Sequence, residues 1–500
     1  MKLIATLFMV CMLCFPVLMN AQVNGDKTQR QRDFENYKLQ RETAFNAFRD
    51  SINQQFAQKL EQRWTDFQVF VGERRPTKPK PAEIPVAPKD TTLRESQSLP
   101  INEVVPAPVV VPVTDSGMME SFHNQIDEQQ NSQAYQKISV DFYTNQLSFQ
   151  LPVAYRQLLL EGLSERAIAK FWTELANGDF ATCIEECWQQ RDQLHLNDWA
   201  MYDIVTKISE ETFPKHYAEQ TVFSIFLLNQ LGLDAKIGRT NTQLLSLVPA
   251  QTQIYGRPYI ACDTTVYYMF SAYPREQQNL TSVSTYQVPF PANTHPLDLN
   301  IYEPINFVSH PSNVIYQTTY WESVIPYQVN QNAIDFYDRY PQVDIAIYAN
   351  AQMSQELKDW ATKQMQPTLS EYSNYEAVSM LLYYLQSEFD YATDVEQFGY
   401  EKPFFCEENF YYRKNDCEDR AILFAYLVRN LVGNDMVLLD YPDHIATAVY
   451  FPDEKIVGDY YVVNDKKYYV CDPTYVGASI GEAMPMYKDI KADIILLREN

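Results

Sequence analysis

The sequence predicts an α+β protein that contains an internal duplication. Two pairs of similar segments predict it. The helix-like stretch TVFSIFLLNQLG (221–232) is similar to AILFAYLVRNLV (421–432), 200 positions later. Two Tyr-rich strands with a turn follow each stretch, as GRPYIACDTTVYYMF (256–270) and GDYYVVNDKKYYVCD (458–472), at an offset of 202. A repeat of this kind predicts two copies of one unit, each a helical layer followed by a small antiparallel sheet.

The length of the chain also favours several domains. With 500 residues it is too long for a single hydrophobic core. We expect a first repeat at 132–279, which opens with the two strands of KISVDFYTNQLSFQL (137–151), and a second repeat at 351–500. Between them, a β-rich connector is expected at 280–350, with strands in VIYQTTYWESVIPYQV (314–329) and VDIAIYA (343–349).

The N-terminus has the pattern of a secretory signal. Lys2 precedes an apolar run from Leu3 to Met19, and a small residue stands at Ala21. We therefore expect residues 1–21 to be a signal peptide cleaved after Ala21, and the mature protein to be secreted or periplasmic. No later run of 18 uninterrupted apolar residues occurs, so no membrane span is expected.

Two further segments precede the first repeat. From Phe34 to Phe70 the large apolar residues are three or four positions apart, or sums of these steps, which predicts a long amphipathic helix within 22–75. Its apolar face could pack within the molecule, or bind a partner or a second copy through residues 30–71. Residues 76–113 then contain nine prolines and no glycine, so 76–115 is predicted to be a semi-rigid, Pro-rich linker.

Charge and cysteine content exclude several classes of function. A formal net charge of −24 argues against nucleic-acid binding, which needs clustered Lys and Arg. The six cysteines beyond the signal are not spaced as a disulfide framework. Cys183 and Cys187, four apart in a predicted helix, have no nearby pair of histidines to complete a zinc site, and we interpret both as core residues. No metal and no cofactor are predicted.

A candidate nucleophile stands at the start of a predicted helix in YYRKNDCEDRAILFAYLVRN (411–430). Asn415 or Asp416 can cap this helix, which places Cys417 in its first turn, where free N–H groups favour a thiolate. The neighbouring acids oppose that effect, so a basic partner is needed. DYPDHIATAV supplies His444 at the start of a strand, and YYVCDPTY supplies Asp472 at a strand end, suited to orient the imidazole.

The order of these residues resembles the transglutaminase-like superfamily. The motifs DCEDRAILFAYLVRNL, YPDHIATAV and CDPTY carry the resemblance, with spacings of 27 and 28 residues between Cys417, His444 and Asp472. It covers residues 375–480 well and 195–275 weakly, and NLVGND departs from the usual turn between helix and strand. The resemblance implies two papain-like modules, with a Cys-His-Asp triad in the second, but it does not identify a substrate. We expect a protein or peptide substrate.

Each residue alone has a simpler interpretation. Cys417 can be a buried helix cysteine, His444 a half-buried histidine, and Asp472 a turn former before Pro473. A metal site of His444, Asp440, Asp443 and Cys417 fits the pattern less well than a triad. Two side chains in the 388–416 segment, which we expect to roof the cleft, are candidate oxyanion donors, namely Gln397 and Tyr412.

Catalytic residues are expected only in the second repeat. Tyr217 corresponds to Cys417, Phe270 or Ser271 corresponds to Asp472, and no histidine occurs between His216 and His295. The sequence therefore predicts an extracytoplasmic cysteine peptidase or amidase with a silent first repeat. Acyl transfer to amines and a non-catalytic scaffold with a vestigial triad are the alternatives.

Overall fold

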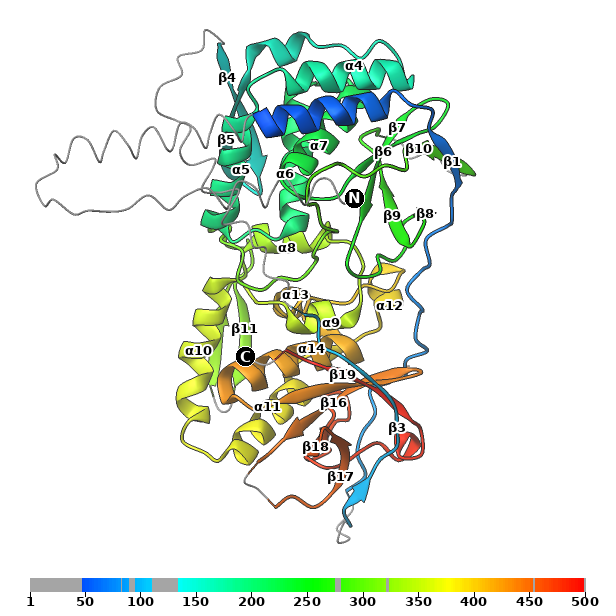
Figure 1. The fold of residues 1–500 in the computed structure, drawn as a ribbon. Helices are drawn as coiled ribbons and strands as arrows, with labels where there is room; N and C mark the ends of the chain where they lie inside the picture. The colour runs from blue at the N-terminus through cyan, green and yellow to red at the C-terminus, as the bar shows by residue number, and fades with distance from the viewer. Residues whose placement is uncertain are drawn as a thin grey trace, which may run out of the picture.

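The computed structural model describes residues 47–81, 83–89, 95–109, 134–274, 280–320, 323–452 and 455–498. It is an α+β protein with two antiparallel-rich sheets, each packed against helices (Figure 1). The predicted signal peptide, residues 1–21, lies outside the described residues. Within the described ranges, no helix combines the length and the apolar character needed to cross a bilayer.

The first half opens with the predicted hairpin, β4 paired with β5. Its two turn residues, Tyr143 and Thr144, have φ of 49° and 62°, as a tight hairpin with the twist of the strands requires. Four helices follow, two of which are capped by the side chains of Ser164 and Asn197. The elements are β4 (Tyr135–Phe142), β5 (Asn145–Pro152), α4 (Glu165–Ala176), α5 (Ala181–Leu194), α6 (Asp198–Thr212) and α7 (Tyr217–Gln230).

The sheets of the two halves contain four strands in the same antiparallel order. In the first half this order is β6-β7-β9-β8, and in the second it is β15-β16-β18-β17. A helix precedes each set, α7 in the first half and α14 in the second. The first-half strands are β6 (Lys236–Arg239), β7 (Leu244–Pro249), β8 (Tyr259–Cys262) and β9 (Thr265–Phe270). The second-half elements are α14 (Cys417–Leu427), β15 (Met436–Tyr441), β16 (His444–Tyr450), β17 (Asp459–Val463) and β18 (Lys466–Cys471).

The matching elements begin at nearly constant separations. Helices α7 and α14 start at Tyr217 and Cys417, and strands β7 and β16 start at Leu244 and His444, both 200 positions apart. The hairpins differ by 201 positions, since β8 ends at residue 262 and β17 at 463. Asp263 therefore corresponds to Asn464, whereas the offset of 202 in the sequence alignment places it at Asp465, one residue later. Both Asp263 and Asn464 have positive φ, at 52° and 51°.

The connector is only partly β-rich. Its strands are β10 (Ser282–Thr285), which joins the first sheet, and the hairpin β11 (Tyr316–Tyr320) with β12 (Ser323–Tyr327). The predicted strand VDIAIYA was wrong, because Ile345–Asn350 forms helix α9 after α8 (Gln331–Asp338). Ile345, Ile347 and Tyr348 are all buried in α9, so burial on several sides outweighs the alternating pattern of this short segment.

The predicted N-terminal helix is shorter than expected in the described part. Residues 47–60 are helical, and Thr65–Gln68 forms strand β1 against β10. The apolar residues beyond the helix, Phe67 and Val69, have strand spacing and pack on a small cluster under the first sheet. The three-residue step from Phe67 to Phe70 suggested a helix, but the alternation of apolar residues with a period of two corresponds to the strand that this segment forms.

The apolar face of helix 47–60 packs within the same chain. Phe56 lies edge-to-face against Trp172 and Phe290, with ring centroids 4.8 and 5.1 Å apart. Asn53 Oδ1 accepts hydrogen bonds from the Trp172 indole and from Gln230, each at 3.1 Å. Of the two uses expected for this face, packing within the molecule holds for the buried residues of 52–64, whereas Phe48 is 62% exposed.

Residues 76–109, which we call the strap, do not form a free linker in their described part. The chain descends along the outside from β1 to the second half (Figure 1). There β2 (Gln97–Ser98) pairs with β17, and β3 (Ile101–Val105) pairs in parallel with β19 (Ala492–Leu496), so the strap supplies both edges of the seven-stranded sheet. Prolines disfavour helix in the strap. The segment INEVV (101–105) contains no proline, so its backbone N–H groups can donate hydrogen bonds to the neighbouring strand β19.

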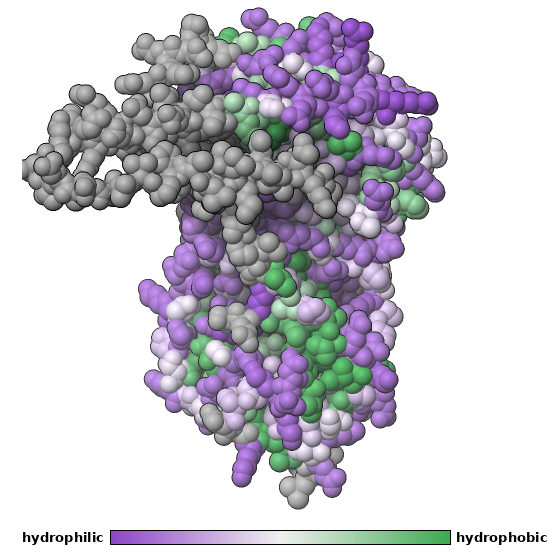
Figure 2. Space-filling model, in the orientation of Figure 1, coloured by the Kyte–Doolittle hydropathy of each residue, from purple (hydrophilic) through white to green (hydrophobic). Residues whose placement is uncertain are grey.

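The second half is a sheet with two buried faces. One face packs on α14 and α11, in the core that also continues through the first half. The other face is covered by the segment after β18 and by Leu99 of the strap. Figure 2 shows hydrophobic residues gathered over the second half, where β3 and β19 lie. The remaining helices are α10 (Gln355–Leu369), α11 (Asn374–Glu388), α12 (Asp394–Phe398) and α13 (Cys406–Tyr412).

Candidate active site

Cys417 is the first residue of helix α14. Asp416 is the N-cap and forms a capping box with Asp419, as the sequence predicted for one of its two candidate caps. Just upstream, β14 (Lys414–Asn415) pairs with β13 (Asp390–Tyr391), which anchors the chain that enters the helix. The cap fixes the start of the helix, and the helix fixes where Cys417 stands.

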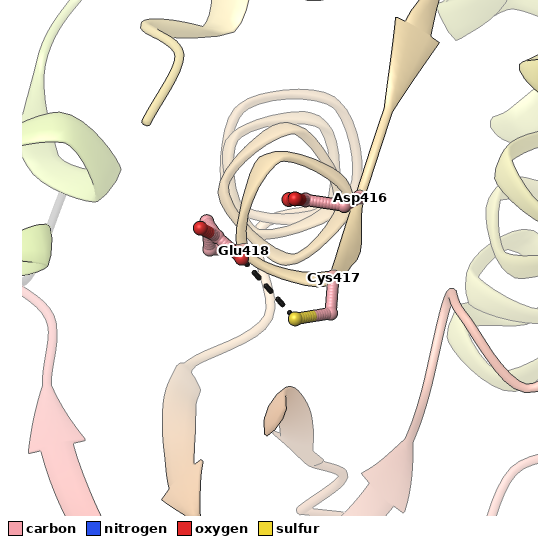
Figure 3. Close-up of side chains that lie close together, drawn as sticks. All are labelled: Asp416, Cys417 and Glu418. Carbon is pink, nitrogen blue, oxygen red and sulfur yellow. Dashed lines mark hydrogen bonds between the residues drawn. The ribbon is translucent and has the colours of Figure 1, made fainter. Parts of the chain in front are cut away.

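The thiol is fully buried and has two close neighbours. Its Sγ donates to Glu418 Oε2 at 3.1 Å, and the backbone N–H of Ile445 donates to the sulfur. Figure 3 shows Asp416, Cys417 and Glu418 at the start of α14, with the thiol and the Glu418 carboxylate turned toward each other. The contact with Ile445 places the sulfur beside the first residues of β16, where His444 stands.

His444 and Asp472 form a buried pair. His444 Nε2 and Asp472 Oδ2 are 2.8 Å apart, and the second carboxylate oxygen of Asp472 accepts the backbone N–H of Thr474 at 2.9 Å. The His444 ring stacks on Tyr487, with centroids 5.1 Å apart. Nδ1 of His444 is buried and has no hydrogen-bond partner in the structure, since the thiol is bonded to Glu418 instead. Sequence reasoning named all three residues, and the structure joins two of them directly.

Two buried side chains that the sequence analysis missed hold these segments together. Arg420, fully buried in α14, donates to the Asn415 side chain at 2.9 Å, to the Phe389 carbonyl at 2.7 Å and to the Pro473 carbonyl at 3.4 Å. Gln386 donates to the carbonyl of Asp472 at 3.2 Å. Arg420 thus connects the chain before Cys417 with the chain after Asp472.

An acidic cluster surrounds the start of α14, and its cation comes from the strap. The Lys80 ammonium lies 2.5 Å from Asp416 Oδ2, 2.5 Å from Glu418 Oε1 and 3.1 Å from Glu401 Oε1. Its side chain is 2% exposed. Lys80 is therefore buried between the two acids that flank Cys417, 337 positions before it. No spacing in the sequence indicates this contact.

The charges of the cluster set the protonation of its members. Burial, with the nearby charge of Glu418, raises the pKa of Asp394 and of Glu401 to about 7. Burial also acts to raise the pKa of Glu418, but Lys80 and hydrogen bonds from neighbouring carboxyl groups outweigh it and bring that pKa below its usual range. The Lys80–Glu418 pair is thus charged at neutral pH, while Asp394 and Glu401 are partly protonated.

The same surroundings disfavour the thiolate of Cys417. Burial raises its pKa well above the ordinary thiol value, and the charges of Glu418 and Asp416 raise it further. Lys80 and the N–H of Ile445 act in the opposite direction. The described arrangement therefore holds Cys417 as a neutral thiol, and Lys80 is a nearby cation that the sequence analysis did not name, beside the basic partner His444 that it did.

Removal of that cation gives a first testable result. In Lys80→Met, the pKa of Cys417 is expected to rise, because the carboxylates of Glu418 and Asp416 remain and the ammonium is lost. The rate of alkylation by iodoacetamide at mildly alkaline pH should fall about tenfold, which corresponds to about one pKa unit. Lys80→Arg should restore much of the rate. Lys78→Met, which removes a partly exposed lysine paired with Asp440, is the control. An unchanged alkylation profile in Lys80→Met would contradict the expected influence of Lys80.

The predicted oxyanion donors have other partners. Gln397 donates to the Ala392 carbonyl at 3.3 Å, and the Tyr412 hydroxyl donates to Asp338 at 3.0 Å. Neither has a described contact with Cys417. Tyr391, which sequence reasoning missed, pairs with Asn415 just before the nucleophile and has a buried hydroxyl without a hydrogen-bond partner. The short strand pair that brings it there has no recognisable sequence pattern.

The acids also bear on metal binding. Oxygen atoms of Asp394, Glu401 and Glu418 lie within 4.8 Å of one another, as do those of Asp394, Asp416 and Asp419. The Lys80 ammonium contacts acids of both groups, namely Glu401 and Glu418 of the first and Asp416 of the second. The metal set considered from the sequence does not assemble, because Asp440 pairs with Lys78 and His444 with Asp472.

The corresponding positions of the first half carry none of these groups. Tyr217 starts α7, Leu244 starts β7 and Ser271 follows β9, at the places of Cys417, His444 and Asp472. The Tyr217 ring packs against Tyr273, with centroids 5.1 Å apart. These residues cannot supply a thiolate and a basic imidazole.

Comparisons with known proteins do not identify the chain. No model of a protein family matches it, and a search of curated proteins found no match.

Proposed function

We propose that the protein is an extracytoplasmic cysteine hydrolase, a peptidase or amidase of the transglutaminase-like type. One observation carries the proposal, namely the His444–Asp472 pair, in which His444 Nε2 and Asp472 Oδ2 are 2.8 Å apart and His444 Nδ1 has no partner. The next residue along β16, Ile445, contacts the Cys417 sulfur through its backbone N–H. A carboxylate on one ring nitrogen leaves the other to accept a proton. The shared strand order of the two sheets supports a duplicated papain-like module.

The reaction requires the Cys417 side chain to rotate from Glu418 to His444. His444 Nδ1 then takes the thiol proton, and the sulfur forms a bond to the substrate carbonyl carbon while the π electrons move onto oxygen. Collapse of this adduct breaks the C–N bond, and the leaving amine takes the proton from His444. Water, deprotonated by His444, hydrolyses the thioester and restores the thiol.

The developing oxyanion needs donors that are already in place. The backbone N–H of Cys417, in the first turn of α14, is one of the N–H groups that a helix leaves unpaired. We assign the second donor to the Tyr391 hydroxyl, because it is buried beside this turn and unpartnered. Arg420 and Gln386 act as positioning residues, since their contacts are with backbone and amide groups around the site.

Two alternatives have an observation of their own. Acyl transfer to amines is favoured by Lys80, whose side chain shows that a lysine can lie beside Cys417. A non-catalytic scaffold is favoured by the complete burial of the thiol and its bond to Glu418.

The deciding experiment assays the full chain without its signal on a peptide library and on a glutamine peptide with a dansylated amine. We expect cleavage that is lost in Cys417→Ala. Amine incorporation without cleavage would favour transfer. Neither activity, together with a rate of Cys417 alkylation that does not change in His444→Ala, would favour the scaffold.

A further inference from the structure

A cavity of about 550 Å³ lies between the two halves of the protein. The strap, the first half and the connector supply most of its walls. It reaches the candidate active site, because Glu418 and Ile445, the two residues that contact the Cys417 sulfur, are among its lining residues. Cys417 itself does not line the cavity, so a molecule there would lie one residue away from the sulfur, against Glu418 and Ile445.

The cavity is strongly acidic. Seven carboxyl groups line it, against the two basic side chains of Arg75 and Lys78. Lys78 is paired with Asp440, and Arg75 donates to the Val343 carbonyl at 2.8 Å. The carboxyl groups are those of Glu103, Asp298, Asp344, Glu401, Glu418, Asp440 and Asp493.

One wall of the cavity presents acceptors without a cation bound to them. Asp344 accepts the hydroxyls of Thr252 and Tyr255 at 2.7 and 2.8 Å, and it has no ion pair within 4.0 Å among the residues that the structure describes. Asp298 accepts the side chains of Asn300 and Tyr302, each at 2.7 Å. The guanidinium of Arg498 acts on Asp298 at longer range.

Asn300 adds an observation that points to a ligand. Its side chain is buried, with 5% exposed, and it lines the cavity. Its amide nitrogen donates to Asp298, but its Oδ1 has no hydrogen-bond partner in the structure. Buried acceptors are usually paired, so the free Asn300 Oδ1 indicates that a ligand supplies the donor. The carboxylates of Asp298 and Asp344, which also line the cavity, favour a donor that is positively charged.

We propose that this cavity binds the substrate and that the wall of Asp298, Asn300 and Asp344 takes the guanidinium or ammonium group of an arginine or lysine side chain in a peptide. A guanidinium offers five N–H donors and an ammonium three, which match these oxygen acceptors. The assignment of this ligand as a substrate rests on the proposed function of Cys417. Recognition of the cation does not, and it is tested separately.

The test measures binding to the full chain carrying Cys417→Ala, so that no turnover occurs. The probes are fluorescein-labelled heptapeptides of alanine and glycine with a central arginine, lysine, glutamine or glutamate, followed by anisotropy at low and high salt. The arginine and lysine peptides should bind at least about tenfold more tightly than the glutamate peptide, and less tightly at high salt.

Variants locate the contact. Asp344→Asn and Asp298→Asn should each weaken the arginine peptide about tenfold, and Asn300→Leu, which removes the unpartnered acceptor, should weaken it as well. Asp263→Asn, at an exposed hairpin turn, is the control. Melting temperatures for each variant exclude a general loss of structure, and Asn300→Leu remains informative if an Asp→Asn variant is unstable.

The outcomes separate this proposal from the proposed function. Equal binding of arginine and glutamate peptides, or binding unaffected by the wall variants, would overturn it. Agmatine, a free guanidinium compound, should compete weakly, and binding as tight as that of the peptide would show that the site takes a small cation instead of a peptide. Charge-selective binding in a protein without hydrolytic activity would leave the cation site standing and remove the hydrolase.

Discussion

Replacement of Cys417 by alanine is expected to lower the kcat/KM of peptide hydrolysis by about 10⁴-fold or more, to the level of the uncatalysed background. The variant lacks the sulfur that forms the acyl-enzyme, and no other described side chain beside His444 can replace it. His444→Ala should cost about as much, and the double variant little more, because residues that act as one unit are not additive. Kinetics on the best substrate of the library measure all three.

The internal duplication supplies a matched control. Tyr217 starts α7 as Cys417 starts α14, and Tyr217→Phe removes only the hydroxyl of a half-buried residue. We expect turnover close to that of the unaltered protein. A large loss of activity in Tyr217→Phe with an unchanged melting temperature would mean that the first half takes part in the chemistry, and a normal rate in Cys417→Ala would refute the assigned nucleophile.

Local patterns were sufficient for the elements that lie next to one another in the chain. The hairpin β4–β5, helices α7 and α14, and the strands that carry His444 and Asp472 follow from spacing, caps and turns within about ten residues. The order of Cys417, His444 and Asp472 along the chain also gave the residues of the candidate site. The structure of these elements depends on short-range preferences, such as apolar spacing, helix caps and turn residues, which can be identified in the sequence.

Elements whose structure depends on distant contacts could not be predicted in this way. VDIAIYA alternates like a strand, yet Ile345–Asn350 is a buried helix against α14. The strap has the composition of a linker, yet its strands β2 and β3 form both edges of the sheet whose other strands lie within 436–496. Lys80 reaches the site through ion pairs with Asp416 and Glu418, and Tyr391 reaches it through the pairing of β13 with β14. No residue spacing near Lys80 or Tyr391 indicates these distant contacts.

Arg420 shows the same limit for a single side chain. A charged residue three positions after a helix start is usually solvated, but this guanidinium is fully buried because three oxygen acceptors from separate segments surround it. Burial lowers its pKa to about 10, so it remains protonated at neutral pH. Its contacts join the end of α11 just before β13, the entry to α14 and the loop after Asp472, which are the three segments that define the candidate site.

Arg420→Met is therefore expected to destabilise the protein by about 3–5 kcal/mol, since it leaves buried carbonyl oxygens of Phe389 and Pro473 without a donor. The measurement is the free energy of unfolding in urea, followed by fluorescence. Activity should fall further than stability explains, because the loop of Asp472 loses its connection to the helix of Cys417. Arg166→Met, on the exposed face of α4 with 89% of its side chain accessible, is the matched control and should leave the unfolding free energy nearly unchanged. If Arg420→Met proves as stable as the control, then the contacts of Arg420 do not hold these segments together, and the positioning of Asp472 must depend on Gln386 and the sheet alone.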